Sequence, residues 1–290
     1  MKWSIPFAVP FTFTAAVAGT QSSASVRIPY NVAVYGISIA ASNNVTSPGV
    51  QYSYNLEFVN FDSGDSLMDE PIQTLNLQTD ARTYFKLPSK WYLKKSDKIV
   101  CNLNMLAGSA TTTVFITLLT TVVDSDPNPG RTPFIYNFPI NLGFQDNVTT
   151  FSGLRTLAFN QHSSGTISKH MLNDFELWGL TLDTSNGDGG LVRYPDFGLQ
   201  VSIQNRKKFF DRITLNSNVG GGTTFGQGNF ITGFPNNNVQ QYVLPQPELI
   251  RRGEIVRVDI AAAPTYLTPA QVHVLLNRLA SVALIGSHIG

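Results

Sequence analysis

The chain is poor in charged residues and nearly free of cysteine. Charged side chains make up 13% of the 290 residues, and the net charge is +1. That share is about half the value usual in soluble proteins. Such a balance gives no field that would steer nucleic acid, so we expect no specific nucleic-acid partner. Cys101 is the single cysteine, so no internal disulfide can form, and its alternating apolar surroundings predict a core position.

Long apolar runs are also missing. No run approaches the roughly 20 residues that a membrane-spanning helix needs, so we expect no membrane span. The start of the chain superficially resembles a secretion signal, because Lys2 precedes apolar residues and Ala16-Val17-Ala18 resembles a cleavage site. Pro6 and Pro10 interrupt that run, and we expect the segment to belong to the folded protein.

Recognisable catalytic and metal-binding motifs are absent from the sequence. It has no Gly-x-Ser-x-Gly motif, and its four histidines lack the spacing of zinc ligands. We therefore expect no enzyme, no cofactor and no bound metal. Two acidic turns have part of a calcium-loop pattern, but Asp, Asn and Gly are also the residues that turns require. They are Asp124, Asp126 and Asn128 in the first turn, and Asp183, Asn186 and Asp188 in the second.

What the chain does contain is an internal repeat. Residues 244–260 match residues 87–103 without a gap, at a spacing of 157. Both stretches begin with Leu-Pro, and Arg251-Arg252 falls on Lys94-Lys95. Three shorter matches keep the same order: 6–7 with 133–134 at a spacing of 127, 34–39 with 177–182 at 143, and 54–60 with 199–205 at 145. Because the order is kept while the spacing grows, we infer a duplicated unit.

Each copy consists of short alternating apolar runs separated by turn residues, which predicts β-strands. Each half offers about seven or eight such runs, the size of a jelly roll. We therefore expect an all-β chain of two tandem jelly-roll-like β-sandwich domains. The predicted boundaries are 1–124 for the first domain, 125–132 for a linker rich in proline, and 133–290 for the second domain.

The segment 268–285 fits two structures. Thr268 followed by Pro269 is a typical helix start. The repeat instead predicts a closing strand, because it places three apolar positions of this segment on strand positions of the first copy. These pairs are Val272 with Phe115, Val274 with Thr117, and Leu276 with Leu119.

The first 24 residues predict an extended arm or an edge strand. Pro6 and Pro10 fix the backbone and remove hydrogen-bond donors. An extended segment can bind the sheet edge of a neighbouring protein, and large aromatic side chains are strong anchors in interfaces. We therefore predict that the arm contacts a partner through Trp3, Phe7, Phe11 and Phe13.

Five motifs follow one another in the second copy. They are Pro133-Phe134, Leu-Trp-Gly-Leu-Thr-Leu at 177–182, Leu-Gln-Val-Ser-Ile-Gln at 199–204, the Leu-Pro stretch at 244–260, and Val-His-Val-Leu-Leu at 272–276. This succession resembles structural proteins of tailed-bacteriophage virions, here as two fused copies. The resemblance implies a non-enzymatic protein of the virion, such as a head decoration, minor capsid or head–tail accessory protein. It also implies contacts with other virion proteins and assembly as a homo-oligomer.

Three other functions stay open at this point. Two sandwiches in one chain also fit a major capsid protein of double jelly-roll type. A β-sandwich that binds carbohydrate or a receptor at a phage tail is a further possibility. Hydrolysis of glycosides by paired carboxylates ranks last, because the sequence distinguishes no such pair.

Overall fold

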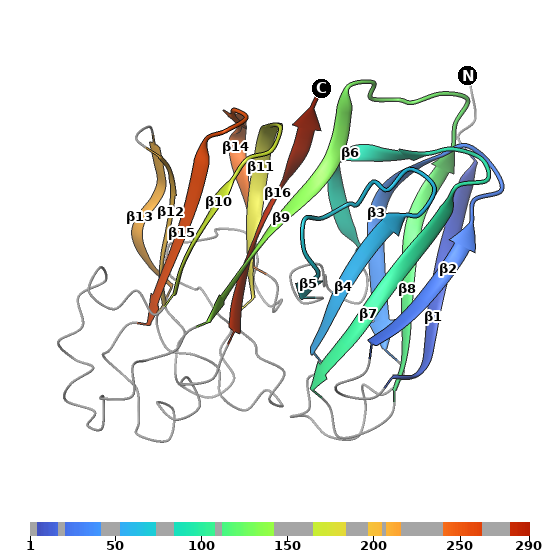
Figure 1. The fold of residues 1–290 in the computed structure, drawn as a ribbon, viewed down its shortest axis with the longest axis horizontal. Helices are drawn as coiled ribbons and strands as arrows, with labels where there is room; N and C mark the ends of the chain where they lie inside the picture. The colour runs from blue at the N-terminus through green and yellow to red at the C-terminus, as the bar shows by residue number, and fades with distance from the viewer. Residues whose placement is uncertain are drawn as a thin grey trace.

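A computed structural model describes residues 5–16, 21–41, 53–73, 84–107, 112–141, 165–183, 197–204, 207–215, 240–262 and 279–290. The regular elements of these ranges are all strands (Figure 1). They are β1 (Pro6–Ala16), β2 (Gln21–Arg27), β3 (Val32–Ala41), β4 (Ser53–Asn60), β5 (Ile72–Gln73), β6 (Phe85–Leu93), β7 (Lys98–Ala107), β8 (Thr112–Val122), β9 (Arg131–Asn141), β10 (Gly165–His170), β11 (Asp174–Asp183), β12 (Phe197–Ile203), β13 (Lys207–Leu215), β14 (Gln240–Ile250), β15 (Ile255–Ala262) and β16 (Leu279–Ile289). Within these ranges, no helix is long and apolar enough to cross a membrane.

The strands form four antiparallel four-stranded sheets, two from each half of the chain. In the first half the sheet orders are β1-β8-β3-β6 and β2-β7-β4-β5. In the second half they are β9-β16-β11-β14 and β10-β15-β12-β13, which is the same order with eight added to each strand number. This connectivity is that of a jelly roll. The predicted all-β fold with two tandem jelly-roll-like sandwiches is confirmed.

Strand registers confirm most of the spacings of the repeat. Phe7 pairs with Thr120 and Phe134 with Gly286, so the spacing of 127 relates β1 to β9. Trp91 pairs with Val34, and 157 residues further on Glu248 pairs with Leu177. β3 and β11 also have a register shift at the same place, immediately before Gly36 and Gly179. A β-bulge at equivalent positions is a feature that two copies of one domain would share.

The match between 54–60 and 199–205 was wrong by two residues. Phe58 pairs with Cys101 and Val201 pairs with Val258. Cys101 and Val258 are 157 residues apart, so the equivalent of Phe58 is Val201, at a spacing of 143 rather than 145. A shift of two residues keeps every side chain on the same face of the sheet, which is why the apolar pattern did not reveal the error.

The closing strand was also placed wrongly. β16 begins at Leu279, and Val272, Val274 and Leu276 lie outside the described residues. Thr120 faces Val34 and Gly286 faces Leu177, so the spacing here is 166 instead of 157. Between equivalent positions of these strands the second copy therefore has nine residues more than the first, and a gapless extension of the repeat could not find this insertion.

Of the two forms predicted for the start of the chain, the structure shows the edge strand, which is β1 of the first sandwich. β1 pairs with β8 along its length, and its alternate side chains Val9, Phe11 and Phe13 are 0%, 1% and 4% exposed in the core. Because these three positions repeat every second residue on the inner face, pairing and burial occur together. Phe11 and Phe13 therefore have no surface to offer a partner.

The two sandwiches touch along the edge strands β6 and β9, in the middle of Figure 1. The segment after β4 crosses to β9, where Met68 bridges Ile135 in parallel. The Ile135 N–H donates to the Leu67 carbonyl at 3.0 Å, and the Asp69 N–H donates to the Ile135 carbonyl at 3.2 Å. Ile135 and Ile285 belong to the same buried cluster as the core of the first half. The predicted domain boundaries at 124 and 133 remain a prediction.

Candidate functional site

Two equivalent turns carry the basic pairs of the repeat, and we call residues 94–97 and 251–254 the basic turns. In the first, the Lys94 N–H donates to Asp97 Oδ2 at 2.9 Å. In the second, the Arg251 N–H donates to Glu254 Oε2 at 2.7 Å. The reverse backbone bonds, from Asp97 N to the Lys94 carbonyl and from Glu254 N to the Arg251 carbonyl, are both 3.1 Å. The turn is therefore the same structure used twice.

Further contacts of the basic turns are duplicated as well. The Lys95 N–H donates to Asn31 Oδ1 and the Arg252 N–H donates to Asp174 Oδ1, both at 2.8 Å. Each turn also needs one residue with positive φ, which is Ser96 at 77° and Gly253 at 84°. The side-chain oxygens of these turns thus hold backbone N–H groups, while the basic side chains of both pairs are exposed.

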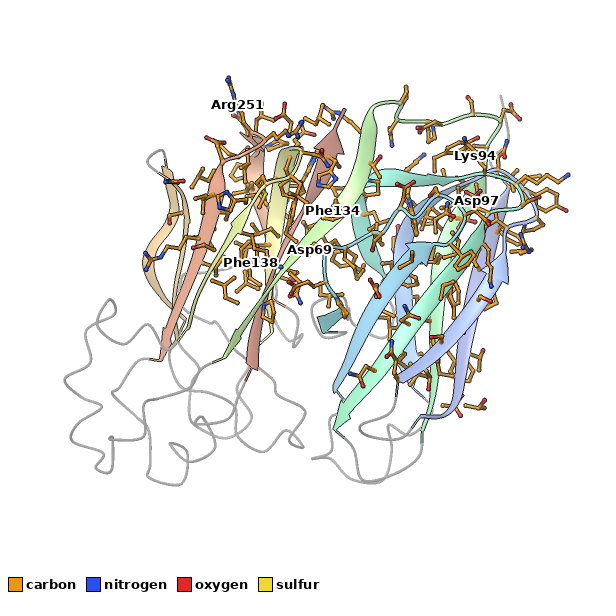
Figure 2. All side chains as sticks on the ribbon, in the orientation of Figure 1. Asp69, Lys94, Asp97, Phe134, Phe138 and Arg251 are labelled. Carbon is orange, nitrogen blue, oxygen red and sulfur yellow. The ribbon has the colours of Figure 1, made fainter. Side chains whose placement is uncertain are left out.

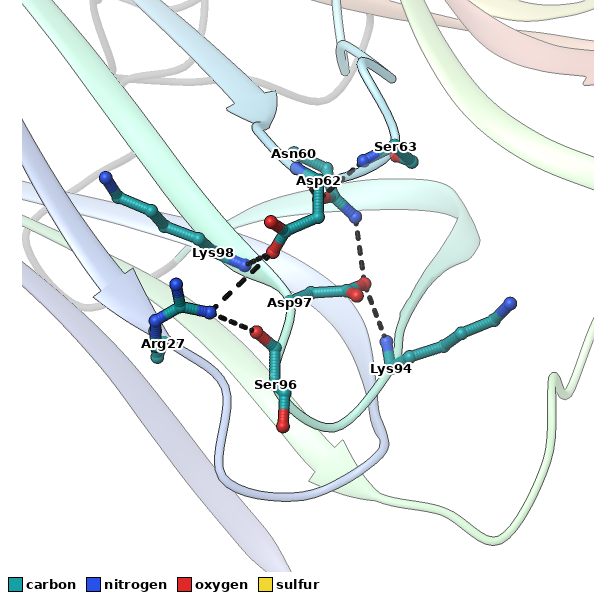
Figure 3. A network of polar contacts seen from close by, with 8 residues as sticks. All are labelled: Arg27, Asn60, Asp62, Ser63, Lys94, Ser96, Asp97 and Lys98. Atoms are coloured by element: carbon teal, nitrogen blue, oxygen red, sulfur yellow. Dashed lines mark hydrogen bonds and ion pairs between the residues drawn. The ribbon is translucent and has the colours of Figure 1, made fainter.

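A polar network joins the first basic turn to its neighbours (Figure 3). Asp97 Oδ2 also accepts from Asn60 Nδ2 at 2.8 Å. Asp62 Oδ2 accepts from the Lys98 N–H at 2.7 Å and lies 4.0 Å from Arg27 Nη1. Arg27 in turn donates to the Ser96 carbonyl at 3.0 Å. These contacts fix the ends of β2, β4, β6 and β7 at one end of the first sandwich.

An open polar cleft of about 390 Å³ lies beside this network and the start of β9. Its carboxylates already accept hydrogen bonds from the turns, as Asp97 and Asp62 do. Trp91 is 3% exposed, so it presents no open ring face on which a sugar could stack. The lining residues are Asn60, Asp62, Ser63, Asp65, Trp91, Tyr92, Lys94, Asp97, Asp126, Arg131 and Thr132.

The acidic turns of the sequence do not gather metal ligands in the described part of the chain. Asp126 Oδ1 accepts from the Asn128 N–H at 2.8 Å, which is the hydrogen bond of an Asx turn. Asp183 ends β11, while Asn186 and Asp188 lie outside the described residues. No group of three or more His, Cys, Asp or Glu side chains is placed to hold a metal within the described ranges.

A second polar cluster locks the junction of the two sandwiches. Lys169 Nζ on β10 lies 2.6 Å from Asp69 Oδ2 and 2.9 Å from Glu70 Oε1. The Asn137 N–H donates to Asp69 Oδ1 at 2.8 Å. Burial raises the pKa of Asp69, and the hydrogen bond from Lys169 partly offsets this rise. Lys169 and Asp69 are both 17% exposed, so the pair is largely desolvated.

His288 is the histidine that the fold buries most clearly among the described residues. Its ring stacks on Phe134 with 4.1 Å between ring centroids, and its Nε2 lies 3.0 Å from the Tyr136 hydroxyl. Desolvation lowers the pKa of His288 to about 4 and raises the pKa of Tyr136 to about 12. At neutral pH both groups are uncharged, so this cluster packs as part of the sheet interior.

The four residues predicted to contact a partner are separated by the structure. Phe11 and Phe13 lie in the core. Phe7 is partly buried, with its ring edge-on to Tyr30 at a centroid distance of 6.0 Å. Trp3 lies outside the described residues, and its contact stays a prediction.

Two sets of residues were missed at the sequence level. Asp97 and Glu254 occupy the same position of the repeat, so comparison of the copies could have identified their turn-closing role. Asp69 and Lys169 are 100 residues apart and belong to no local pattern.

The comparisons with known proteins give matches of structure alone. No family model matches the chain, and no curated protein matches its sequence significantly. The major capsid protein P2 from Bacteriophage PM2 aligns over 98% of both chains, with 9% identity and a TM-score of 0.46. A structure from Sulfolobus Turreted Icosahedral Virus covers 98% of this chain and 90% of its own, with 12% identity and a TM-score of 0.40. Viral capsid structures are thus among the matches, whereas the tailed-phage type stays a prediction.

Another match corrects the prediction that the chain is no enzyme. PNGase F, a glycosylasparaginase from Flavobacterium meningosepticum, covers 100% of this chain and 98% of its own, with 10% identity and a TM-score of 0.43. The matching structures therefore include both enzymes and capsid proteins. At these identities and TM-scores the likeness concerns layout and assigns no function. The two-sandwich layout does not exclude catalysis.

Proposed function

We propose that the chain is a structural protein of a virus particle, and specifically a double jelly-roll subunit of its shell. Jelly rolls are common building units of viral capsids. The observation that carries the proposal is the edge contact between the two jelly rolls, because it joins two copies of one domain through different surfaces. The low charge of the chain, 13% of its residues, suits surfaces that are buried against other subunits.

The edge contact is heterologous: β6 of the first copy meets β9 of the second. By the repeat, the equivalent of β6 is β14 and the equivalent of β9 is β1. Among the described strands, β14 pairs only with β11 and β1 pairs only with β8, so each is the edge of its sheet. A contact between β14 of one chain and β1 of the next would repeat the internal contact. Heterologous contacts of this kind generate rings when the rotation closes.

The exposed side chains of β14 support this assembly. Leu249 is 42% exposed and Val243 is 57% exposed. Leu249 is the repeat equivalent of Tyr92, which lines the cleft at the internal junction together with Arg131 and Thr132. Pro245 and Pro247 on the same strand block addition of another strand by backbone hydrogen bonds. This edge therefore favours a contact through side chains, like the one between β6 and β9.

The assembly is tested with Val243→Glu combined with Leu249→Glu. We expect the native chain to form closed oligomers in mass photometry, and the double variant to shift to single chains with an unchanged melting temperature. Phe115→Glu is the matched control, because Phe115 is 44% exposed but lies on β8, in the interior of its sheet. Loss of oligomers with the control and not with the double variant would contradict the β14–β1 contact.

The place in the particle is tested by copy number. A shell subunit is present at a number that matches the shell lattice. The accessory role implied by the resemblance requires a low copy number and binding to a preformed shell. Quantitative mass spectrometry of purified particles separates these outcomes, and complete absence of the chain from particles would overturn the proposal.

A further inference from the structure

The two basic turns together carry four basic side chains that face solvent. Lys94, Lys95, Arg251 and Arg252 are all exposed. Among the described residues, no ion pair or side-chain hydrogen bond involves their charged groups. Their backbone N–H groups, in contrast, shape the turns. The side chains are therefore dispensable for the turn structure, yet the pair is basic in both copies.

Carboxylates close to these cations are tied to the backbone. Asp97 and Glu254 accept from the first residue of each basic pair, and Asp174 accepts from the Arg252 N–H. Asp97 and Glu254 are half-buried, whereas the Lys and Arg side chains of both turns are exposed. Figure 2 shows Lys94 and Arg251 at the same end of the molecule, one from each sandwich. Both sandwiches therefore expose a basic pair at that end.

Exposed apolar side chains gather at the same end. Ile5 precedes β1 and accepts from the Val122 N–H at the end of β8. Tyr30, Phe61 and Leu172 lie in the turns that follow β2, β4 and β10. These four side chains are 62%, 54%, 66% and 71% exposed in that order. These four are half of the eight large apolar side chains that are most exposed among the described residues. They lie next to strand ends on the same side of the sandwiches as the basic turns.

We infer that this end of the molecule binds the surface of an anionic lipid bilayer. Lys and Arg attract acidic headgroups, and apolar side chains next to them enter the boundary between headgroups and acyl chains. Single-stranded nucleic acid fits less well, because Ile5 and Leu172 cannot stack on bases as aromatic platforms do. The inference does not depend on the particle role proposed above, since it rests on one chain.

The expected strength follows from the charges. Each Lys or Arg close to an anionic membrane contributes a factor of about 5 to the partition coefficient, so loss of one basic pair weakens binding about 30-fold. The full chain is tested by co-sedimentation with vesicles of phosphatidylcholine containing 30% phosphatidylserine, against vesicles of phosphatidylcholine alone. We expect binding to the anionic vesicles, weakened by salt, and little binding to the neutral ones.

Three double variants, each of which removes two positive charges, locate the contact. Lys94→Gln with Lys95→Gln, and Arg251→Gln with Arg252→Gln, should each lower vesicle binding about 30-fold. Lys86→Gln with Arg257→Gln is the matched control, because both residues are exposed within strands and away from the turns. Melting temperatures of all three variants establish that they are folded. Equal losses with the control and the turn variants would overturn the inference, as would no binding by the native chain.

A second set of variants separates lipid from nucleic acid. Phe61→Ser with Leu172→Ser keeps every charge and should lower the part of vesicle binding that survives high salt. A gel shift with single-stranded DNA of 40 nucleotides is run beside it. Binding of the DNA without binding of the vesicles would overturn the lipid surface in favour of nucleic acid.

Discussion

At the scale of single residues, equivalent positions of the two copies can be compared directly. Ser96 and Gly253 occupy the same position of the basic turns with φ of 77° and 84°. A side chain at positive φ costs about 1 kcal/mol, whereas glycine adopts this conformation without penalty. The second copy thus lacks a strain that the first has. Arg27 binds the backbone carbonyl of Ser96, so that contact does not depend on the serine side chain.

We therefore expect Ser96→Gly to stabilise the protein by about 1 kcal/mol. The reciprocal change, Gly253→Ser, should destabilise it by a similar amount. Urea denaturation measures both, and the midpoint should shift while the slope stays constant. A loss of stability on Ser96→Gly would mean that the serine hydroxyl contributes more than the backbone strain costs.

At the scale of elements, β1 shows what composition leaves open and what alternation decides. Pro6 and Pro10 fitted either an extended arm or an edge strand, because proline removes hydrogen-bond donors. β1 lies at a sheet edge, where proline is tolerated. The alternation of Val9, Phe11 and Phe13 was the better signal, since strands bury every second side chain.

We expect deletion of residues 1–13 to abolish folding of the first sandwich. The deletion removes three buried side chains and leaves one edge of β8 without its partner. Deletion of residues 1–4 is the control and should leave the melting temperature unchanged, because β1 starts at Pro6. Circular dichroism melts of both truncations measure the effect. A folded 1–13 deletion that only fails to assemble would restore the arm as a partner contact.

The repeat shows how far the sequence predicts elements and where it stops. The gapless match of 87–103 with 244–260 located β6, β7, β14, β15 and both basic turns. It did not locate β16, because nine additional residues precede that strand. It also missed the two-residue offset of β12, since strands have a period of two and the apolar pattern is the same in either alignment. Periodicity thus predicts faces reliably and register only where no insertion intervenes.

At the scale of the whole molecule, the junction depends on residues that no local pattern connects. Lys169 approaches Asp69 at 2.6 Å and Glu70 at 2.9 Å, and it comes from the opposite sandwich. Its ammonium also lies 5.5 Å from the centre of the Phe138 ring. These contacts form only when both sandwiches are folded and docked, which is why the sequence could not predict them. The same residues couple the stability of one sandwich to that of the other.

Lys169→Met tests this coupling. Removing the ammonium leaves the Asp69 carboxylate desolvated without its main partner, and losing one member of a buried pair costs about 3 kcal/mol. Glu70 is 47% exposed and adds little, because water screens exposed pairs. Calorimetry should show a lower and broader transition, as the two sandwiches cease to unfold together.

Lys169→Met combined with Asp69→Leu should recover most of the loss, because no buried charge is then left unpaired. Lys95→Met, at an exposed position of the first basic turn, is the control, and a loss there equal to that of Lys169→Met would show that the junction pair has no special role.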